Sequence, residues 1–265
     1  MLFAEHLCVI RGGGDLGTGV ALCLSRAGFP VAVCELADPL TVRRAVALSS
    51  AVTRGEVTVE GLTARRVNDA GEVSDLAATG VVPVLVDHGL PRVSQSVVVD
   101  ARMAKRPLDT RPDDAPFVVA LGPGFSAGKD CHAVVETLRG SHMGQVLWEG
   151  STEPDTGTPA PVGGRTADRV LRAPVDGTIG WDRRIGDLVE AGEVLGRVGN
   201  REVAAPFDGL IRGLILNGIK VTSGTKVGDV DPRGKTASAH EVSDKALAVG
   251  GGVLEAVLTW LNRTG

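Results

Sequence analysis

The pattern of apolar and polar residues near the start of the chain predicts a β-α-β unit. Residues 7–11 form a mostly apolar run typical of a buried strand, and residues 16–27 place apolar side chains at helical spacing. Gly28 favours the end of that helix, because glycine readily adopts the backbone conformation found after a helix C-terminus. The wholly apolar run 31–34 predicts a parallel strand buried on both faces, and Glu35 closes it.

The same patterns predict elements farther along the chain. Apolar runs predict three more strands, at residues 81–86, 97–99 and 117–121. Helical spacing predicts helices at residues 39–48, 130–138 and 246–261. Strands and helices in this order predict an α/β domain with a Rossmann-like parallel sheet. Ligands of such sheets bind at the carboxyl ends of the strands, so we expect the functional site there.

A change of composition after Glu149 predicts a domain boundary. Residues 150–161 are rich in Pro, Gly, Ser and Thr, which is typical of an exposed connection. We therefore predict a nucleotide- or cofactor-binding domain over residues 1–150 and a small β-domain over residues 151–240. Residues 241–265 are expected to form a C-terminal docking helix.

The predicted second domain contains an internal repeat. The sequence of Ala173–Gly177 returns with one change at Ala205–Gly209. Further matches at the same offset join Gly186 to Gly218, Val189 to Val221 and Gly192 to Gly224. Two similar halves of short β segments resemble the barrel-sandwich fold of biotinyl and lipoyl carrier domains. Those carriers are loaded on a hairpin lysine, and no lysine occurs here between Lys129 and Lys220, so we expect no covalent cargo.

A glycine-rich motif lies between the first strand and the first helix. Its residues are Gly12, Gly13, Gly14, Asp15 and Gly17, in the pattern G-x-G-x-x-G. Such glycines permit a tight turn and close backbone approach, while the amides at the helix start attract phosphate. Glu35 is placed to accept hydrogen bonds from a ribose. The alternative is a purely structural turn, which Asp15 favours because an acid repels phosphate unless it points away.

Two further groups extend the predicted cofactor site. Gly122 and Gly124 follow a strand and precede an expected helix, so they form either a second anion cradle or a plain connecting loop. Asp100, Arg102 and Lys105 form a charged cluster after another strand. The two cations suit a phosphate or a carboxylate, and the alternative is a solvated loop.

Three side chains are candidates for metal binding or proton transfer. His132 and Glu136 would share a helix face with His142 beyond them, and a surface hydrogen bond is the alternative. Their spacing matches no recognised zinc or iron motif, so we expect no metal site. Cys131 would lie near a helix start, which lowers a thiol pKa, although an inert thiol is the interpretation we favour.

The overall composition limits the classes of partner. The net charge is −4 with both signs interspersed, so we expect neither nucleic acid nor an anionic membrane as a partner. No signal-peptide pattern and no apolar run near the roughly 18 residues that cross a bilayer are present, which favours a cytoplasmic protein. The four cysteines show no C-x-x-C spacing, so we expect neither a disulfide nor a zinc site.

Five segments together resemble the YqeB-like proteins of selenium-dependent molybdenum hydroxylase systems. They are residues 11–19, 100–105, 121–125, 132–137 and 172–177. The resemblance implies an accessory factor in the maturation of molybdenum hydroxylases, with a hydroxylase as its client. It also implies a first half similar to XdhC-type chaperones, which handle molybdopterin cofactor. It identifies no catalytic residue.

These observations lead to one expected function and two alternatives. We expect a maturation factor that binds a phosphate-bearing cofactor or nucleotide, of the NAD(P) or molybdopterin type, at the glycine-rich strand ends. One alternative is an NAD(P)-dependent oxidoreductase that uses Glu35, although the chain has no Tyr as proton donor and His132 has no assigned partner. The other is a carrier or scaffold built on the β-domain. Whether any reaction is catalysed stays open.

Overall fold

The computed structural model describes residues 1–87, 89–106, 108–155, 157 and 161–264. The chain divides into two compact units. The first unit comprises Met1–Ala37, Ala47–Asp155 and Val242–Gly265, and the second comprises Asp38–Val46 and Thr156–Glu241. Part of the predicted connection at residues 150–161 lies outside the described residues. The second unit is thus not one continuous stretch of chain, because it includes the short segment Asp38–Val46 from the early part of the sequence.

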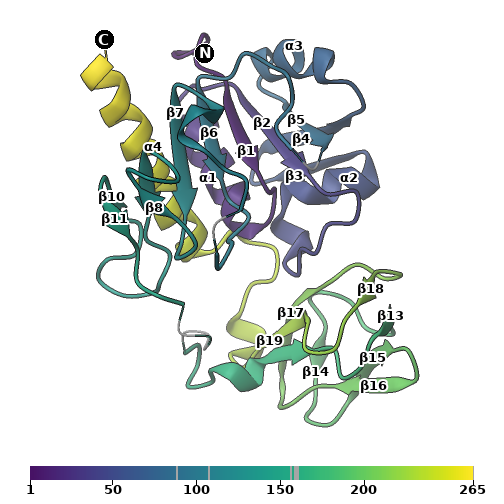
Figure 1. Ribbon diagram of the computed structural model, residues 1–265. Coiled ribbons are helices and arrows are strands. Elements are labelled where there is room, and N and C mark those ends of the chain that lie inside the picture. The colour runs from purple at the N-terminus through teal and green to yellow at the C-terminus, as the bar shows by residue number, and fades with distance from the viewer. Residues whose placement is uncertain (88, 107, 156, 158–160, 265) are drawn as a thin grey trace. The chain divides into compact units, whose positions relative to one another are not determined.

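A nine-stranded mixed sheet forms the centre of the first unit (Figure 1). Its order is β10-β9-β7-β6-β1-β2-β5-β4-β3. The strands are β1 (Cys8–Arg11), β2 (Val31–Glu35), β3 (Glu56–Val59), β4 (Leu62–Val67), β5 (Val82–Val86), β6 (Val97–Asp100), β7 (Phe117–Leu121), β9 (Ala133–Val135) and β10 (Val146–Leu147). Neighbours pair in parallel except at the two ends, where β3 runs antiparallel to β4 and β10 to β9.

Four α-helices occur among the described residues. They are α1 (Asp15–Arg26), α2 (Ala51–Arg54), α3 (Val73–Ala78) and α4 (Asp244–Thr264). Short 3-10 turns occupy Arg44–Val46, Leu48–Ser50, Ala70–Glu72, Pro112–Asp114, Ala167–Arg169 and Gly234–Thr236. A small two-stranded sheet joins β8 (Ser126–Ala127) to β11 (Gly150–Ser151). Each of these helices is too short or too polar to span a membrane.

The fold class predicted from the sequence, a Rossmann-like parallel sheet followed by a barrel-sandwich domain, was wrong. The structure is a mixed α/β fold with a large mixed sheet. Helices connect neighbouring parallel strands between β1 and β2 and between β4 and β5, whereas β6 reaches β7 through coil and one 3-10 turn in the described residues. The regular alternation of strand and helix that defines the predicted class is therefore missing.

Two predicted helices account for this error. Residues 39–48 contain only a 3-10 turn at Arg44–Val46 and the start of another, and residues 130–138 contain the strand β9. The side chains of Ala133, Val134 and Val135 are fully buried in β9. Valine favours strands because its branched side chain packs well on a pleated surface, and here that preference outweighed the helical spacing.

Helix α4 packs along α1 in the first unit, as Figure 1 shows. The two helices approach closely at Gly19 and Gly250. A Cβ atom added to Gly250 would lie 2.5 Å from the carbonyl oxygen of Gly19, and one added to Gly19 would collide with the backbone of Ala246. The glycines near residue 250 therefore permit a close helix crossing.

The second unit consists of two four-stranded sheets with one shared apolar core. Their orders are β12-β19-β17-β14 and β16-β15-β13-β18. The strands are β12 (Val170–Arg172), β13 (Gly177–Trp181), β14 (Leu188–Val189), β15 (Val194–Val198), β16 (Arg201–Ala204), β17 (Gly209–Leu214), β18 (Lys220–Val221) and β19 (Lys226–Asp231). The sequence repeat therefore recurs as corresponding strands, although a repeat alone does not specify the family of folds to which the unit belongs.

Candidate functional site

The candidate site lies in the first unit, where the parallel strands end. In the register of the sheet, Arg11 at the end of β1 is paired with Cys34 in β2 and with Asp100 at the end of β6. Glu35 follows Cys34 directly and ends β2. Arg11, Glu35 and Asp100 are therefore brought to one edge of the sheet, where the sequence predicted a ligand site.

The glycine loop between β1 and α1 is tightly packed. Gly12 has a φ of +97°, and a Cβ atom there would lie 3.3 Å from the backbone nitrogen of Arg102. A Cβ atom on Gly17 would collide with the carbonyl oxygen of Gly12. Gly14 is the N-cap of α1, and no side chain caps the helix there. The loop therefore has the tight turn and close approach expected from its sequence.

Gly13 is covered by other parts of the same chain. Its amide donates to Oε2 of Glu35 at 2.9 Å, and its carbonyl accepts from the amide of Ser49 at 2.8 Å. A Cβ atom on Gly13 would lie 2.9 Å from both Ser49 N and Val33 Cγ1. Beyond Gly13 the loop leads directly into the first turn of α1, which begins at Asp15.

Glu35 fastens the glycine loop to the end of β2. Its second oxygen, Oε1, accepts from the amide of Leu36 at 2.8 Å. Burial raises the pKa of Glu35, and the hydrogen bonds from Leu36 and Gly13 oppose that rise. Both carboxylate oxygens of Glu35 thus contact backbone amides, so the structure gives Glu35 a role in holding the loop.

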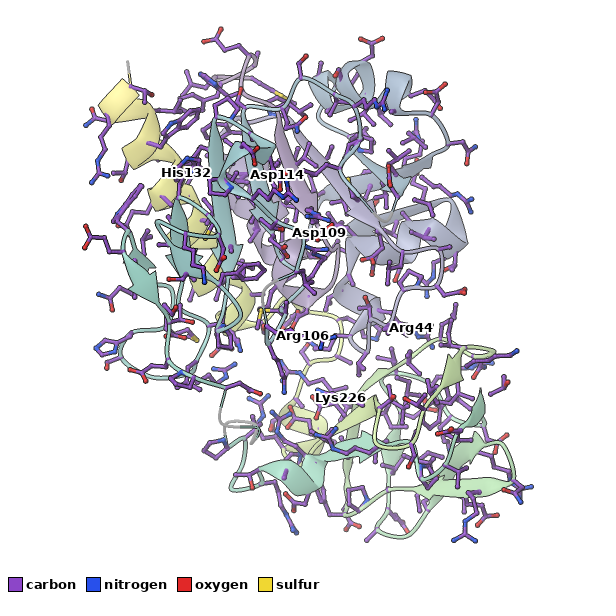
Figure 2. All side chains as sticks on the ribbon, in the orientation of Figure 1. Arg44, Arg106, Asp109, Asp114, His132 and Lys226 are labelled. Carbon is purple, nitrogen blue, oxygen red and sulfur yellow. The ribbon has the colours of Figure 1, made fainter. Side chains whose placement is uncertain are left out.

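Two arginines and two aspartates form a compact ion-pair network beside this loop. Arg102 binds Asp100 through Nη2 at 2.5 Å and through Nε at 3.1 Å. Arg11 donates from Nη2 to Oδ2 of Asp109 at 2.6 Å, and Arg102 Nη1 lies 2.8 Å from Oδ1 of the same carboxylate. Asp109 lies on the connection between β6 and β7 and is labelled in Figure 2.

Thr110 links the members of the network. Its hydroxyl accepts from Arg11 Nη1 at 2.9 Å and from Arg102 Nη2 at 3.0 Å, and it donates to Asp100 at 2.5 Å. The side chain of Asp100 is fully buried and that of Arg11 is 3% exposed, whereas Asp109 is 59% exposed. The network therefore has a rigid buried part and one acid at the surface.

The two arginines also control the protonation of Asp109. Partial burial alone would raise the pKa of Asp109, but the hydrogen bonds and charges of Arg11 and Arg102 lower it to about 2. Asp109 is therefore a carboxylate at every physiological pH. The sequence analysis did not single out Arg11 as a site residue, nor Asp109 and Thr110. The one available indication was a charged residue, Arg11, directly after a wholly apolar strand.

Gly122 and Gly124 pack against the residues that follow Arg102, and Lys105 pairs with an acid outside the network. A Cβ atom on Gly122 would lie 3.3 Å from Met103 Cε, and one on Gly124 would collide with the backbone of Ala104. The strand β8 follows this segment in place of the expected helix, so a helix dipole is missing there. Lys105 is exposed and pairs with Asp155 at 2.5 Å.

His132 and Glu136 lie at the two ends of the strand β9 and not on the predicted helix face, and their side chains accept from different backbone amides. His132 Nδ1 accepts from the amide of Val118 at 3.0 Å, and burial lowers the pKa of His132. Glu136 is buried and accepts from the amides of Leu138 and Glu153 at 2.7 and 2.8 Å, while His142 is exposed. Across the described part of the chain, no three His, Cys, Asp or Glu side chains form a group able to hold a metal ion.

Cys131 does not have the environment that its predicted position suggested. The residues after it form β9, so no helix start lies beside the thiol. The side chain is 1% exposed, and burial raises the pKa of Cys131 to about 12. The inert thiol that the sequence favoured fits this geometry, whereas the lowered thiol pKa, the interpretation that was set aside, does not.

Comparisons with family models and solved structures found no close counterpart of this fold. No family model matches the chain. The succinylglutamatedesuccinylase/aspartoacylase structure from Rhodobacter sphaeroides is 18% identical, covering 85% of this chain and 84% of that chain with a TM-score of 0.29. The ectoine utilization protein EutE (DoeB) from Ruegeria pomeroyi, in its apo structure, is 14% identical, covering 51% and 60% with a TM-score of 0.24. Scores this low support no argument about this chain.

The sequence of one curated protein is much more similar. The uncharacterized protein YqeB of Escherichia coli (strain K12) is 48% identical over 262 residues, which cover 98% of this chain and 48% of YqeB. The chain thus spans about half the length of this relative. The resemblance to YqeB noted from sequence segments therefore extends along nearly the whole chain and corresponds to about half of YqeB.

Proposed function

We propose that this chain binds a phosphate-bearing small molecule at the carboxyl ends of β1 and β6. The observation that carries the proposal is the pair of guanidinium groups, from Arg11 and Arg102, that converge on the Asp109 carboxylate at these strand ends. The N-cap residue of α1, Gly14, makes no side-chain cap, and a Cβ atom on Gly12 would lie only 3.3 Å from Arg102 N. Arginine forks and a helix start both favour phosphate oxygens.

The geometry distinguishes between the parts of the expected cofactor site. The amide of Gly13 is already bonded to Glu35, so the arginines and the amides beyond Gly14 are the groups we propose for the ligand. Glu35 contacts the amides of Gly13 and Leu36. Because both Glu35 oxygens already accept from backbone amides, Glu35 adds no reason to expect a dinucleotide ribose. NAD is therefore one ligand among several to be compared.

The finer role that we propose is that of an accessory factor for molybdenum hydroxylases. It is supported by the resemblance of segments 11–19 and 100–105 to YqeB-like proteins, because these segments contain Arg11 and Arg102. On this proposal the bound molecule is a molybdopterin-type cofactor or a nucleotide. The client is a hydroxylase that receives it.

Calorimetric titration of the purified chain tests the binding proposal. The ligands are pyrophosphate, ADP, NAD and molybdopterin, at a fixed ionic strength. We expect saturable binding of at least one phosphate-bearing ligand and a loss of affinity of about tenfold or more in Arg102→Ala, since a charge-assisted contact is removed. Arg54→Ala is the matched control, because Arg54 is exposed at the end of α2. Absence of binding by all four ligands would refute the proposal.

The accessory role has its own test. The chain is purified by affinity tag from a host that makes molybdopterin, and native mass spectrometry then identifies the molecules that accompany it. We expect a mass increase for a pterin or nucleotide and a molybdenum hydroxylase in the same fraction. A chain that carries neither would contradict the role in maturation and leave the binding proposal to the titration.

A further inference from the structure

We infer that the Asp109 carboxylate is an internal occupant of an oxyanion subsite formed by Arg11, Arg102 and Thr110, and that an oxyanion of a ligand takes its place. The inference rests on the proposed function, because both concern the same arginines. It adds that the subsite is already filled, by a group of the protein itself.

Two guanidinium groups share the Asp109 carboxylate. One carboxylate oxygen lies 2.6 Å from Arg11 Nη2 and the other lies 2.8 Å from Arg102 Nη1. Two guanidinium groups that share the two oxygens of one anion form the arrangement by which arginines recognise carboxylate and phosphate ligands. The position of the Asp109 carboxylate is thus a position suited to any oxyanion of similar size.

Asp109 and its partner Arg11 differ in burial. Arg11 is 3% exposed, whereas the Asp109 side chain is 59% exposed. A buried arginine is costly to leave without an anion, so its partner is strongly required. The partner itself faces solvent, from which a dissolved anion can approach the same two arginines.

Asp100 and Thr110 hold the two arginines together without Asp109. The fully buried Asp100 binds Arg102 with both oxygens and accepts from Thr110, which in turn accepts from Arg11. With Asp109 in place, two arginines face two carboxylates and the charges balance. When Asp109 leaves, one positive charge is uncompensated, which favours the entry of an oxyanion.

A competing internal anion has a measurable consequence. The ligand must displace a carboxylate that the chain keeps at high local concentration, so the affinity of the native protein is lowered. The low pKa of Asp109 agrees with a firmly held anion. Removing the carboxylate should therefore create an open site for small oxyanions that bind the native protein weakly.

Binding of inorganic phosphate and of acetate to the full chain tests the inference. Each anion is titrated against Asp109→Ala and the unaltered protein, with chloride holding the ionic strength constant, and calorimetry and the unfolding midpoint are recorded. We expect saturable binding to Asp109→Ala with a Kd at least about tenfold lower than in the unaltered protein. The added anion should also restore the unfolding midpoint that the substitution lowers. A preference for phosphate or acetate identifies which oxyanion the subsite suits.

Two further variants complete the test. Asp168→Ala removes one partner of an exposed ion pair with Arg165 and should gain no anion binding. Asp109→Asn keeps the size of the side chain and replaces Asp109→Ala in the test if the alanine variant fails to fold. We expect the same gain in anion affinity from Asp109→Asn. Equal anion affinity in Asp109→Asn and the unaltered protein would overturn the inference.

The outcomes also separate this inference from the proposed function. If a phosphate-bearing ligand binds the unaltered protein although the Asp109 variants gain no anion binding, the proposed function survives. A third outcome is that phosphate or acetate restores the unfolding midpoint of the Asp109 variants, while pyrophosphate, ADP, NAD and molybdopterin all fail to bind. That outcome would support the subsite and contradict the proposed function.

Discussion

Asp109 illustrates how a single exposed residue comes to depend on buried neighbours. Its two oxygens contact arginines that are anchored by Asp100 and Thr110. The pairing reaches across the chain, because Arg11 ends the first strand and Asp109 lies between the sixth and seventh. The charge of Asp109 therefore affects a part of the molecule far from it in sequence.

The stability contributed by Asp109 should depend on acid pH. Its pKa is about 2 in the folded protein, below the ordinary value of an aspartate side chain. The stabilisation is therefore complete above the unfolded pKa and is lost as the pH falls through the folded pKa. We expect Asp109→Asn to lower the free energy of unfolding by roughly 1 kcal/mol at pH 7, discounted for solvent screening. Urea unfolding at several pH values should show this difference shrinking between about pH 5 and pH 2. A difference independent of pH would contradict the assignment.

The cysteines should differ in reactivity according to burial. Cys8, Cys34 and Cys131 are buried and Cys23 is partly exposed. Burial raises the pKa of Cys131 to about 12, so its thiolate is scarce at neutral pH. We expect an alkylating reagent to modify Cys23 first in the native protein and all four thiols in denaturant, as read by peptide mass spectrometry. Equal labelling of Cys131 and Cys23 in the native protein would contradict the burial of the Cys131 thiol.

At the scale of elements, the sequence predicted strands better than helices. β7 has the bounds that its apolar run indicated, and α1 differs from its prediction by one residue at each end. Residues 130–138 were predicted as a helix because, in a segment this short, the apolar residues around the buried valines of β9 fit helical spacing by chance. Periodicity alone does not separate a short buried strand from a buried helix.

The candidate site could be predicted only in part, for a related reason. The glycine loop and Glu35 could be placed together, because strand order in a parallel sheet fixes where their ends meet. Asp109 and Thr110 lie in a connection without regular periodicity, so no pattern indicates which strand end they contact. Their position follows from tertiary packing, which a single sequence does not encode in local spacing.

The α1–α4 crossing provides a matched pair of glycine substitutions. A Cβ atom on Gly250 would lie 2.5 Å from Gly19 O and 2.8 Å from Cys23 Sγ, while one on Gly251 would meet nothing within 4 Å. We expect Gly250→Ala to lower the free energy of unfolding by about 1–3 kcal/mol through overpacking. Gly251→Ala should raise it by about 0.5–1 kcal/mol, because alanine has the higher helix propensity. Urea unfolding of both variants decides the matter, and equal effects would refute the close crossing.

At the scale of the whole molecule, each unit has an apolar core of its own. One cluster in the first unit includes Val9, Ala32 and Leu85, whereas the cluster in the second unit includes Leu195 and Ile211. Units with separate cores are able to unfold separately. Substitutions in one unit should therefore leave the stability of the other nearly unchanged.

Asp229 in the second unit tests this separation. It is 5% exposed and binds Arg169 Nη1 through both oxygens, at 2.8 and 2.9 Å. We expect Asp229→Ala to cost about 3–5 kcal/mol, because it leaves a largely buried arginine without its partner. In scanning calorimetry one of two transitions should move to lower temperature, and Gly250→Ala should move the other. One shared transition that both variants shift together would contradict separate unfolding.

The way the two sequence repeats share their strands has a consequence for the origin of the second unit. Strands β12 to β15 belong to the first repeat, and β16 to β19 belong to the second. In each sheet the two central strands come from one repeat and the two outer strands come from the other. In one sheet, for example, β19 and β17 lie between β12 and β14. A single repeat would leave those outer positions empty and its apolar face in water. A peptide as short as one repeat would therefore be stable only as a symmetric pair of identical molecules, and gene duplication with fusion turns such a pair into one continuous chain.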